Sequence, residues 1–337
     1  MQTEASKVAI VGAGAWGTTL ALVAHRAGAE TTLLVRNEVA FQSMHSDRSH
    51  PTSLTGVRLP LDLEISQDTE GALAEAEIVI LTIPTQKLRA GVSAIAHQLR
   101  GKIVVSAAKG IEIGTSLLPT QILEEVLGVS PETPICALSG PNLAGEIAIG
   151  KPATTVIAGA DAAANIAVQN ALMGPNFRVY TSSDVVGVQI GGALKNVIAI
   201  GAGIGDGLRA GDNAKAAFMT RGIAEISRLG VALGAQPLTF AGLSGIGDLI
   251  CTCSSNLSRN HHVGVRLAAG ESLAQIRANM KEVAEGVDTT RATVEMARSR
   301  GIDMPIAEEM YRVLFEGKSP EDAVQTLMGR EPRHELH

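Results

Sequence analysis

The chain has 337 residues, with 28 Lys and Arg against 34 Asp and Glu, which gives a net charge of −6. An acidic chain of this kind lacks the basic excess typical of proteins that bind nucleic acids or anionic membranes. Five Phe, two Tyr and one Trp are too few for base stacking or an aromatic membrane belt. A hydrophobic content of 45% excludes a disordered chain. We therefore expect a soluble globular protein of two or three domains that does not bind nucleic acid.

The cysteines and the apolar stretches bear on the compartment. Cys136, Cys251 and Cys253 are an odd number in a long chain, which favours reduced thiols over a disulfide framework. The apolar run near the N-terminus is short, and the longest apolar stretch, 185–204, contains Lys195 and several glycines. We therefore expect no export signal, no integral membrane association and a cytoplasmic location.

The first half of the chain alternates short apolar runs with longer amphipathic stretches. A helix is expected over 15–27, with Gly28 as its stop signal. The runs are apolar throughout rather than alternating, as is typical of strands buried on both faces of a parallel sheet. They lie at 8–11, 32–35, 78–81, 103–105 and 135–138. This order predicts an α/β fold with a doubly wound (Rossmann) N-terminal domain.

The second half of the chain has a different pattern of apolar residues. After about residue 187, Ala, Leu and Ile recur at helical spacing between loops rich in Gly and Ser. No comparable series of buried strands follows, so we predict an all-helical C-terminal domain. We place a dinucleotide-binding Rossmann domain at 1–189 and a helical substrate and catalytic domain at 190–337.

The segment 12–17, GAGAWG, has the GxGxxG spacing of dinucleotide-binding turns. The bare pattern is weak, but here it follows a predicted strand and opens a predicted helix. Gly12 would allow the tight turn, Gly14 the approach of a pyrophosphate, and Gly17 close helix–strand packing. The helix N-terminus would attract the phosphates. The alternative is an ordinary glycine-rich turn without a ligand.

The end of the second strand bears on cofactor choice. NAD-preferring folds usually place Asp or Glu there, to bind the ribose 2′-hydroxyl. This chain has Arg36, which suits a 2′-phosphate and predicts NADP(H), with NAD(H) left open as a second cofactor. Arg36 could instead be a solvated surface residue. Trp16, in the glycine loop, is expected either to pack in the core or to contact the cofactor.

Two further turns follow predicted strands. SAAKG at 106–110 places Lys109 after the strand at 103–105, and SGPN at 139–142 follows the strand at 135–138. Ligands of doubly wound sheets bind outside the carboxyl ends of the strands. Each turn alone could be an ordinary connecting loop, with Lys109 as a solvated charge. Together they favour a substrate crevice.

The helical half contains a lysine in an apolar setting. Lys195 and Asn196 interrupt an apolar helix, GGALKNVIAI at 191–200. A lysine is almost never fully buried without a partner, although it can extend to the surface. Apolar neighbours on nearly every face favour a cleft position. A desolvated amine there could donate or accept a proton.

The segment 242–260, GLSGIGDLICTCSSNLSRN, ends in Ser, Arg and Asn, which suit an anion such as a phosphate. Cys251 and Cys253, with His261 and His262 nearby, raise the possibility of zinc. Their Cys-x-Cys spacing is tighter than that of paired zinc ligands, so we predict no metal site.

Taken together, these segments resemble the bacterial type of NAD(P)-dependent glycerol-3-phosphate dehydrogenase. The resemblance runs nearly end to end, and the Leu-Lys-Asn and Gly-Leu-Ser to Ser-Arg-Asn segments are its most specific parts. It is carried by GAGAWGTTLA (12–21), SAAKGIE (106–112), SGPNLA (139–144), GGALKNVIAIGAGIGDGL (191–208), TRGIAEI (220–226), GLSGIGDLICTCSSNLSRN (242–260) and VAEGVDT (283–289).

The family reduces dihydroxyacetone phosphate to sn-glycerol 3-phosphate, the head-group precursor of glycerophospholipids. The resemblance implies Lys195 as the catalytic residue. The substrate contacts it implies are Lys109, Gly140, Asn142, Lys195, Asp248, Ser258, Arg259 and Asn260. The implied cofactor contacts are Ala15, Trp16, Lys109, Ala144, Arg259, Val283 and Glu285. The glycine motif adds Gly12, Gly14 and Gly17, and the end of the second strand adds Arg36.

Three residues, at two places in the chain, depart from the family's pattern. Asn142 and Leu143 stand where Ser or Thr and then Phe are usual, and Ala15 stands where Ser is common. Asn can still form a hydrogen bond, and a backbone N–H contact at residue 15 survives the change.

The chemistry implied is hydride transfer to a ketone carbon, with Lys195 donating the proton to the developing alkoxide. We expect Asp248 to hold Lys195 in place, and the protein to be a homodimer. Two alternatives stay open: a related Rossmann reductase acting on a small carboxylate, and an NADP(H) sensor without turnover.

Overall fold

In the computed structural model, which describes residues 5–280, 284–331 and 334–335, the N-terminal half of the chain forms an eight-stranded sheet. The strand order is β3-β2-β1-β4-β5-β6-β7-β8, parallel throughout except for the antiparallel pair β6–β7. The strands are β1 (Lys7–Val11), β2 (Glu30–Leu34), β3 (Glu64–Ser66), β4 (Ile78–Leu81), β5 (Ile103–Ser106), β6 (Ile135–Ser139), β7 (Ala153–Gly159) and β8 (Phe177–Ser182).

All five strands predicted from apolar runs are present, as β1, β2, β4, β5 and β6. The prediction missed β3, β7 and β8. Strand β8 alternates buried and exposed residues at the sheet edge, so it lacks a continuous apolar run. Strand β7 runs antiparallel to β6, which the predicted all-parallel order did not include.

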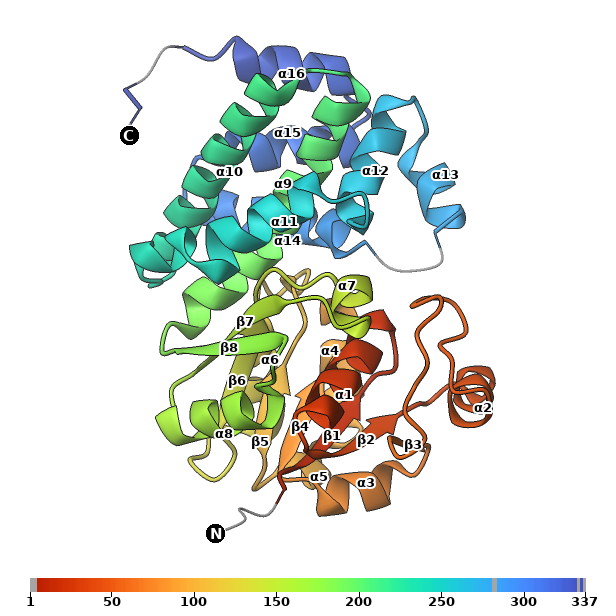
Figure 1. Ribbon diagram of the computed structural model, residues 1–337. Helices are drawn as coiled ribbons and strands as arrows, with labels where there is room; N and C mark the ends of the chain where they lie inside the picture. Colours follow the sequence, from red (N-terminus) through yellow and green to blue (C-terminus); the bar gives the residue numbers. More distant parts are fainter. Residues whose placement is uncertain (1–4, 281–283, 332–333, 336–337) are drawn as a thin grey trace.

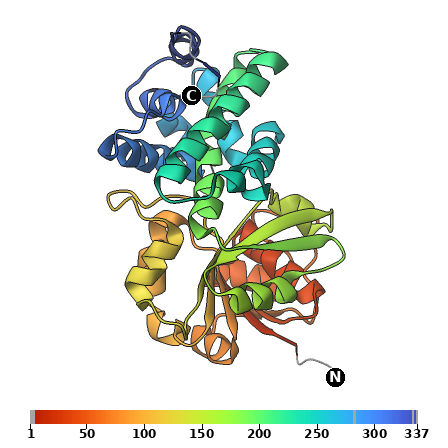
Figure 2. The same cartoon turned by 90° about the vertical axis from the view of Figure 1, so that its left-hand side faces the viewer.

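Helices cover both faces of the sheet (Figure 2). Successive residues of β4 point to opposite faces: Ile80 packs with Leu22 of α1, whereas Val79 packs with Leu88 and Ile122 of α4 and α6. The helices are α1 (Ala15–Arg26), α2 (Glu38–Ser46), α3 (Thr69–Glu75), α4 (Thr85–Ser93), α5 (Ala96–Leu99), α6 (Pro119–Leu127), α7 (Ala144–Ala148) and α8 (Ala162–Leu172). The α1 bounds match the predicted helix, and Gly28 follows it with φ +90°.

The C-terminal half is helical throughout the part that the structure describes, as predicted, and sits above the sheet domain in Figure 1. Its elements are α9 (Val185–Gly207), α10 (Asp212–Ala232), the 3-10 turn η1 (Pro237–Ala241), the π-helical turn η2 (Leu243–Gly247), α11 (Asp248–Ser254), α12 (Arg259–Ala268), α13 (Leu273–Ala278), α14 (Glu285–Ser299), α15 (Pro305–Phe315) and α16 (Pro320–Met328).

Helix α9 is the centre of the helical domain. It is long and apolar enough to cross a membrane, but 89% of its most apolar window is buried inside the protein, as in a core helix. The predicted domain boundary at 189/190 falls inside α9, which begins at Val185, three residues after the end of β8 at Ser182. Cys136, Cys251 and Cys253 are all free thiols, as expected.

Candidate active site

The turn from β1 to α1 has the geometry that the glycine pattern predicted. Gly12 has φ +112°, and a Cβ at Gly17 would lie 1.8 Å from the Gly12 carbonyl oxygen. A Cβ at Gly14 would meet nothing within 4 Å, so the backbone there is open to a ligand. Gly14 is the N-cap of α1 and offers no side-chain acceptor, which leaves the first N–H groups of the helix available to an anion. The Thr82 hydroxyl donates to the Gly12 carbonyl at 2.8 Å and fixes the turn.

Trp16 packs partly buried against the sheet-domain core, which is the packing alternative of the sequence analysis. Its indole Nε1 is buried and donates to no atom among the described residues. Ala15 and Ala144 lie near each other, because the Thr19 hydroxyl reaches the carbonyl oxygens of both, at 2.7 and 3.2 Å. The start of α7 thus lies against the start of α1, beside the glycine turn.

Arg36 follows β2 and is exposed, at the same edge of the sheet as the glycine turn. His50 lies on the other side of the turn, and its Nδ1 accepts from the Ser53 N–H at 3.1 Å. The proton is therefore on Nε2, which donates to the Ala13 carbonyl at 3.1 Å. His50 holds the segment after α2 against the glycine turn.

Two lysines from different domains share one buried carboxylate. Lys195 Nζ donates to Asp248 Oδ1 at 2.6 Å, and Lys109 Nζ donates to Asp248 Oδ2 at 2.7 Å. Lys109 also donates to the Gly140 carbonyl at 2.9 Å. Lys195 is 7% exposed and Asp248 is 1% exposed, so this is a nearly desolvated triad. The Thr252 hydroxyl accepts from Lys195 at 2.7 Å and completes the cluster.

Close backbone approaches bring this cluster together. A Cβ at Gly191 would lie 2.3 Å from the Ser244 carbonyl oxygen, and one at Gly192 would lie 2.2 Å from Ser139 Oγ. Gly245 has φ −97° and ψ −107°, and a Cβ there would collide with the Phe240 backbone. Glycines at these places let η2 and the end of β6 approach α9 directly. As a result, Asp248 begins α11 next to Lys195.

Burial changes the ionisation of two groups in the cleft. It lowers the pKa of Lys109 to about 8, although the Asp248 carboxylate opposes this shift; the charge of Lys195 adds to it. Burial also raises the pKa of Glu285, which the N–H of Thr85 and the positive charges of Arg259, Lys109 and Lys195 oppose. With a pKa of about 8, Lys109 is still mostly charged at pH 7, so it presents a positive charge in the cleft beside Lys195.

The predicted anion segment lies at the start of α12. Ser258 is its N-cap and accepts from the His261 N–H at 3.2 Å, and the exposed Arg259 is the first helical residue. The Asn260 side chain, predicted to contact the substrate, is hydrogen-bonded to other protein groups. It donates to Asn196 Oδ1 and accepts the Gly286 N–H, both at 2.9 Å.

Asn142 is similarly engaged. Its amide donates to the Thr154 carbonyl and accepts from the Thr155 hydroxyl, each at 3.0 Å, so it fastens the SGPN turn to β7. The remaining amide hydrogen leaves the predicted substrate contact open. Glu285 accepts from the Thr85 N–H at 3.3 Å across the interface of the domains. Val283 lies outside the described residues.

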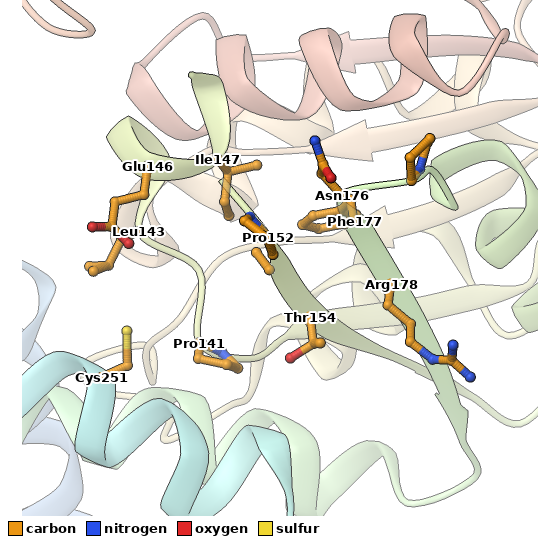
Figure 3. A pocket seen from close by; sticks show the side chains of 12 residues that line it. Pro141, Leu143, Glu146, Ile147, Pro152, Thr154, Asn176, Phe177, Arg178 and Cys251 are labelled. Carbon is orange, nitrogen blue, oxygen red and sulfur yellow. The ribbon is translucent and has the colours of Figure 1, made fainter. Parts of the chain in front are cut away.

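A groove of about 420 Å³ is lined by residues near α7, β7 and β8 and by Cys251, which follows Asp248 on α11 by three residues (Figure 3). Leu143 and Glu146 lie on one wall, and Cys251 points toward them from α11. Burial raises the pKa of the Cys251 thiol, which favours its protonated form. Among the described residues, no group of three or more His, Cys, Asp and Glu could hold a metal ion.

Several residues of the site were not predicted from the sequence. Thr252 follows Asp248 by one helical turn, a spacing that could have indicated its place. Asn196 was noted beside Lys195 but given no role; its amide reaches the Lys109 carbonyl at 3.4 Å. Neither Thr82 nor His50 has a motif, because each acts through a contact distant in sequence.

A Rossmann-type sheet with an open glycine turn meets a helical domain at a buried lysine pair, Lys109 from the sheet domain and Lys195 from α9. This arrangement defines a two-domain nicotinamide-dependent dehydrogenase. Sequence profiles of the NAD-dependent glycerol-3-phosphate dehydrogenase N-terminus and C-terminus match residues 7–165 and 184–325. The chain belongs to this family.

Close relatives agree along nearly the whole chain. It is 48% identical over 332 residues to glycerol-3-phosphate dehydrogenase (NAD(P)+) of Desulfitobacterium hafniense, covering 98% of this chain and 93% of that one. The enzyme of the same name from a Thermoanaerobacter species is 44% identical over 333 residues, with 98% and 99% covered. The crystal structure of glycerol-3-phosphate dehydrogenase from Coxiella burnetii superposes with a TM-score of 0.92 at 31% identity, covering 97% of this chain and 99% of that one.

Proposed function

We propose that the protein reduces dihydroxyacetone phosphate to sn-glycerol 3-phosphate with NAD(P)H, reversibly, and so supplies glycerophospholipid synthesis. The observation that carries this proposal is the buried triad, in which Asp248 holds Lys109 and Lys195 at 2.7 and 2.6 Å. Two ammonium groups at the carboxyl edge of a nucleotide-binding sheet suit a substrate that gains negative charge on a carbonyl oxygen.

The residues at the glycine turn fit a dinucleotide. Gly12, Gly14 and Gly17 give the tight turn and the open backbone, and the N–H groups of Ala15 and Trp16 begin a helix without a side-chain cap. Ala144 and Glu285 would border the cofactor from α7 and α14, with Lys109 and Arg259 near both ligands. NAD(P)H supplies the hydride when bound. Arg36 favours a 2′-phosphate and hence NADP(H), with NAD(H) as a second cofactor.

Lys195 is the proton donor in this proposal. As the ketone carbon is reduced, its oxygen gains negative charge, and the Lys195 ammonium provides both a nearby positive charge and a proton. The Asp248 carboxylate and the Thr252 hydroxyl each hold Lys195 Nζ, which fixes its direction. Lys109 supplies the second positive charge. In the reverse reaction Lys195 accepts the proton from the alcohol.

The start of α12 would bind the substrate phosphate. Arg259 can grip a phosphate with two parallel hydrogen bonds, and Ser258 and Asn260 flank it. The helix N-terminus adds a partial positive charge there. Gly140 and Asn142 would border the substrate from the sheet domain. This remote binding orients the carbonyl toward Lys195.

We further expect a cytoplasmic homodimer that binds no nucleic acid. Three free thiols are compatible with a reducing compartment. The edge strand β8 and the helical domain offer surface for a second copy.

The test follows NADPH absorbance with dihydroxyacetone phosphate, unphosphorylated dihydroxyacetone and a small keto acid in parallel. Rapid oxidation with the phosphorylated ketone alone is expected. Oxidation with the keto acid would indicate a carboxylate reductase, and tight NADPH binding without oxidation of any substrate would indicate a sensor.

A further inference from the structure

We propose that His261 is a positioning residue for the substrate phosphate, because its ring anchors the first turn of α12 to the helix that carries the proton donor. The proposal rests on the function proposed above, in which Ser258 and Arg259 bind the phosphate. His261 itself touches neither ligand in this account. It acts through the placement of its neighbours.

The anchor is a charged cluster that joins three helices. His261 Nε2 lies 2.7 Å from Asp206 Oδ2, and Lys215 Nζ lies 2.6 Å from the same oxygen. Asp206 belongs to α9, Lys215 to α10 and His261 to α12. Burial alone would raise the pKa of Asp206, but the hydrogen bonds and charges of Lys215 and His261 lower it. The carboxylate is therefore ionised at neutral pH and binds the buried imidazole strongly.

The cluster stands in register with the catalytic lysine. Asp206 follows Lys195 on α9 by about three turns, so the two side chains project from the same side of that helix. One turn of α12 therefore meets α9 at two places. Asn260 bonds Asn196 next to Lys195, and His261 bonds Asp206 further along.

Helices α9 and α12 are in direct backbone contact, so the distance between them cannot change easily. A Cβ at Gly203 would lie 2.0 Å from the His261 carbonyl oxygen, and one at Gly264 would lie 1.9 Å from the Ile200 carbonyl oxygen. Their axes are therefore fixed in separation by backbone contact. The side-chain bonds of Asn260 and His261 to α9 add to this packing and help to set the rotation of α12 about its own axis.

The backbone N–H of His261 also positions Ser258, which belongs to the proposed phosphate site. Its N–H donates to Ser258 Oγ at 3.2 Å and so sets the direction of the N-cap side chain. Arg259 lies between these two residues. A shift of about 1 Å at a binding group is enough to weaken substrate orientation markedly. Loss of the His261 ring should thus impair phosphate binding before it impairs the chemistry of Lys195.

The experiment compares His261→Ala with the wild type and with His261→Gln, whose side-chain amide can still donate to Asp206. The KM for dihydroxyacetone phosphate is expected to rise about fivefold to tenfold in H261A. The kcat should stay within about twofold and the KM for NADPH should not change. H261Q is expected to recover most of the KM effect. Arg298→Met is the matched control, because it breaks the ion pair with Glu308 elsewhere in the helical domain.

Several outcomes decide the proposal. An unchanged KM for dihydroxyacetone phosphate in folded H261A overturns it, and so does a KM rise of equal size in R298M, which would reflect general loss of stability. If H261A does not fold, Asp206→Asn replaces it, because it removes the charge that holds the His261 ring, and an unchanged KM for dihydroxyacetone phosphate in D206N overturns the proposal.

A wild-type protein that does not turn over dihydroxyacetone phosphate refutes the proposed function instead. Calorimetry then tests the anchor separately, by titrating inorganic phosphate into the wild type and H261A. Binding weakened about fivefold in H261A supports the anchor, whereas equal binding, or none to either protein, refutes it.

Discussion

Asp248→Asn should destabilise the protein in a way that depends on pH. The Asp248 side chain is 1% exposed and holds two ammonium groups that are 9% and 13% exposed. Removing the partner of a buried charge costs about 3 to 5 kcal/mol, far more than the ~0–1 kcal/mol of a surface pair. We therefore expect D248N to lower the free energy of unfolding by about 3 kcal/mol at pH 7.

The same substitution should cost less at higher pH. The pKa of Lys109 is about 8 in the folded protein, so at pH 9 this amine is mostly neutral and one of the two ion pairs is already weakened. Urea unfolding of the wild type and D248N at both pH values measures the difference. Glu308→Gln, in the partly exposed pair with Arg298, is the matched control and should change stability by less than about 1 kcal/mol.

Two results would contradict the proposal that the Asp248 carboxylate holds two charged lysines. If D248N unfolds within about 0.5 kcal/mol of the wild type at pH 7 and keeps its kcat, the carboxylate does not hold two charged lysines. A loss that grows from pH 7 to pH 9 would also contradict the ionisation described for Lys109.

Further expectations concern single residues. Lys195→Ala should lower kcat by about 10²-fold to 10⁴-fold while the Kd for NADPH is kept; near-normal turnover would exclude the proton-donor role. Arg259→Ala should raise the KM for dihydroxyacetone phosphate roughly tenfold to a hundredfold, and an effect on NADPH alone would contradict its role with phosphate. Arg36→Ala should raise the KM for NADPH much more than that for NADH, and equal effects on both would remove the basis for NADP(H) preference. In the unfolded chain Lys109 has its ordinary pKa of 10.5, so between pH 8 and pH 10.5 the folded wild type binds fewer protons than the unfolded chain. The free energy of unfolding of the wild type should therefore rise over this range, by about 3 kcal/mol in all. Lys109→Met should lack this rise in urea titrations.

The central strands of the fold followed from the sequence, because they are buried on both faces. Burial on both sides makes runs such as Ile78–Leu81 apolar throughout. The edge strand β8 exposes alternate residues, and β7 reverses direction, so neither follows the pattern of the centre. Edge strands depend on pairing with a neighbour more than on their own composition.

Some features of the candidate site could be predicted from the sequence, whereas others depend on contacts between distant segments. Lys195 could be predicted because a lysine in an apolar helix needs a partner, and Asp248 was expected to hold it, which the structure bears out at 2.6 Å. That Lys109 shares the same carboxylate could not be predicted, because it depends on the approach of the two domains. The inward bonds of Asn142 and Asn260 likewise depend on residues distant in sequence.

The most direct test uses NADPH that carries deuterium at both hydrogen positions of carbon 4 of the nicotinamide, with dihydroxyacetone phosphate as substrate. Mass spectrometry and NMR of the product should find sn-glycerol 3-phosphate with one deuterium on carbon 2, formed by the wild type and strongly reduced with K195A. Absence of this deuterated product with the wild type, or its equal formation by K195A, would contradict hydride transfer to a phosphorylated ketone protonated by Lys195.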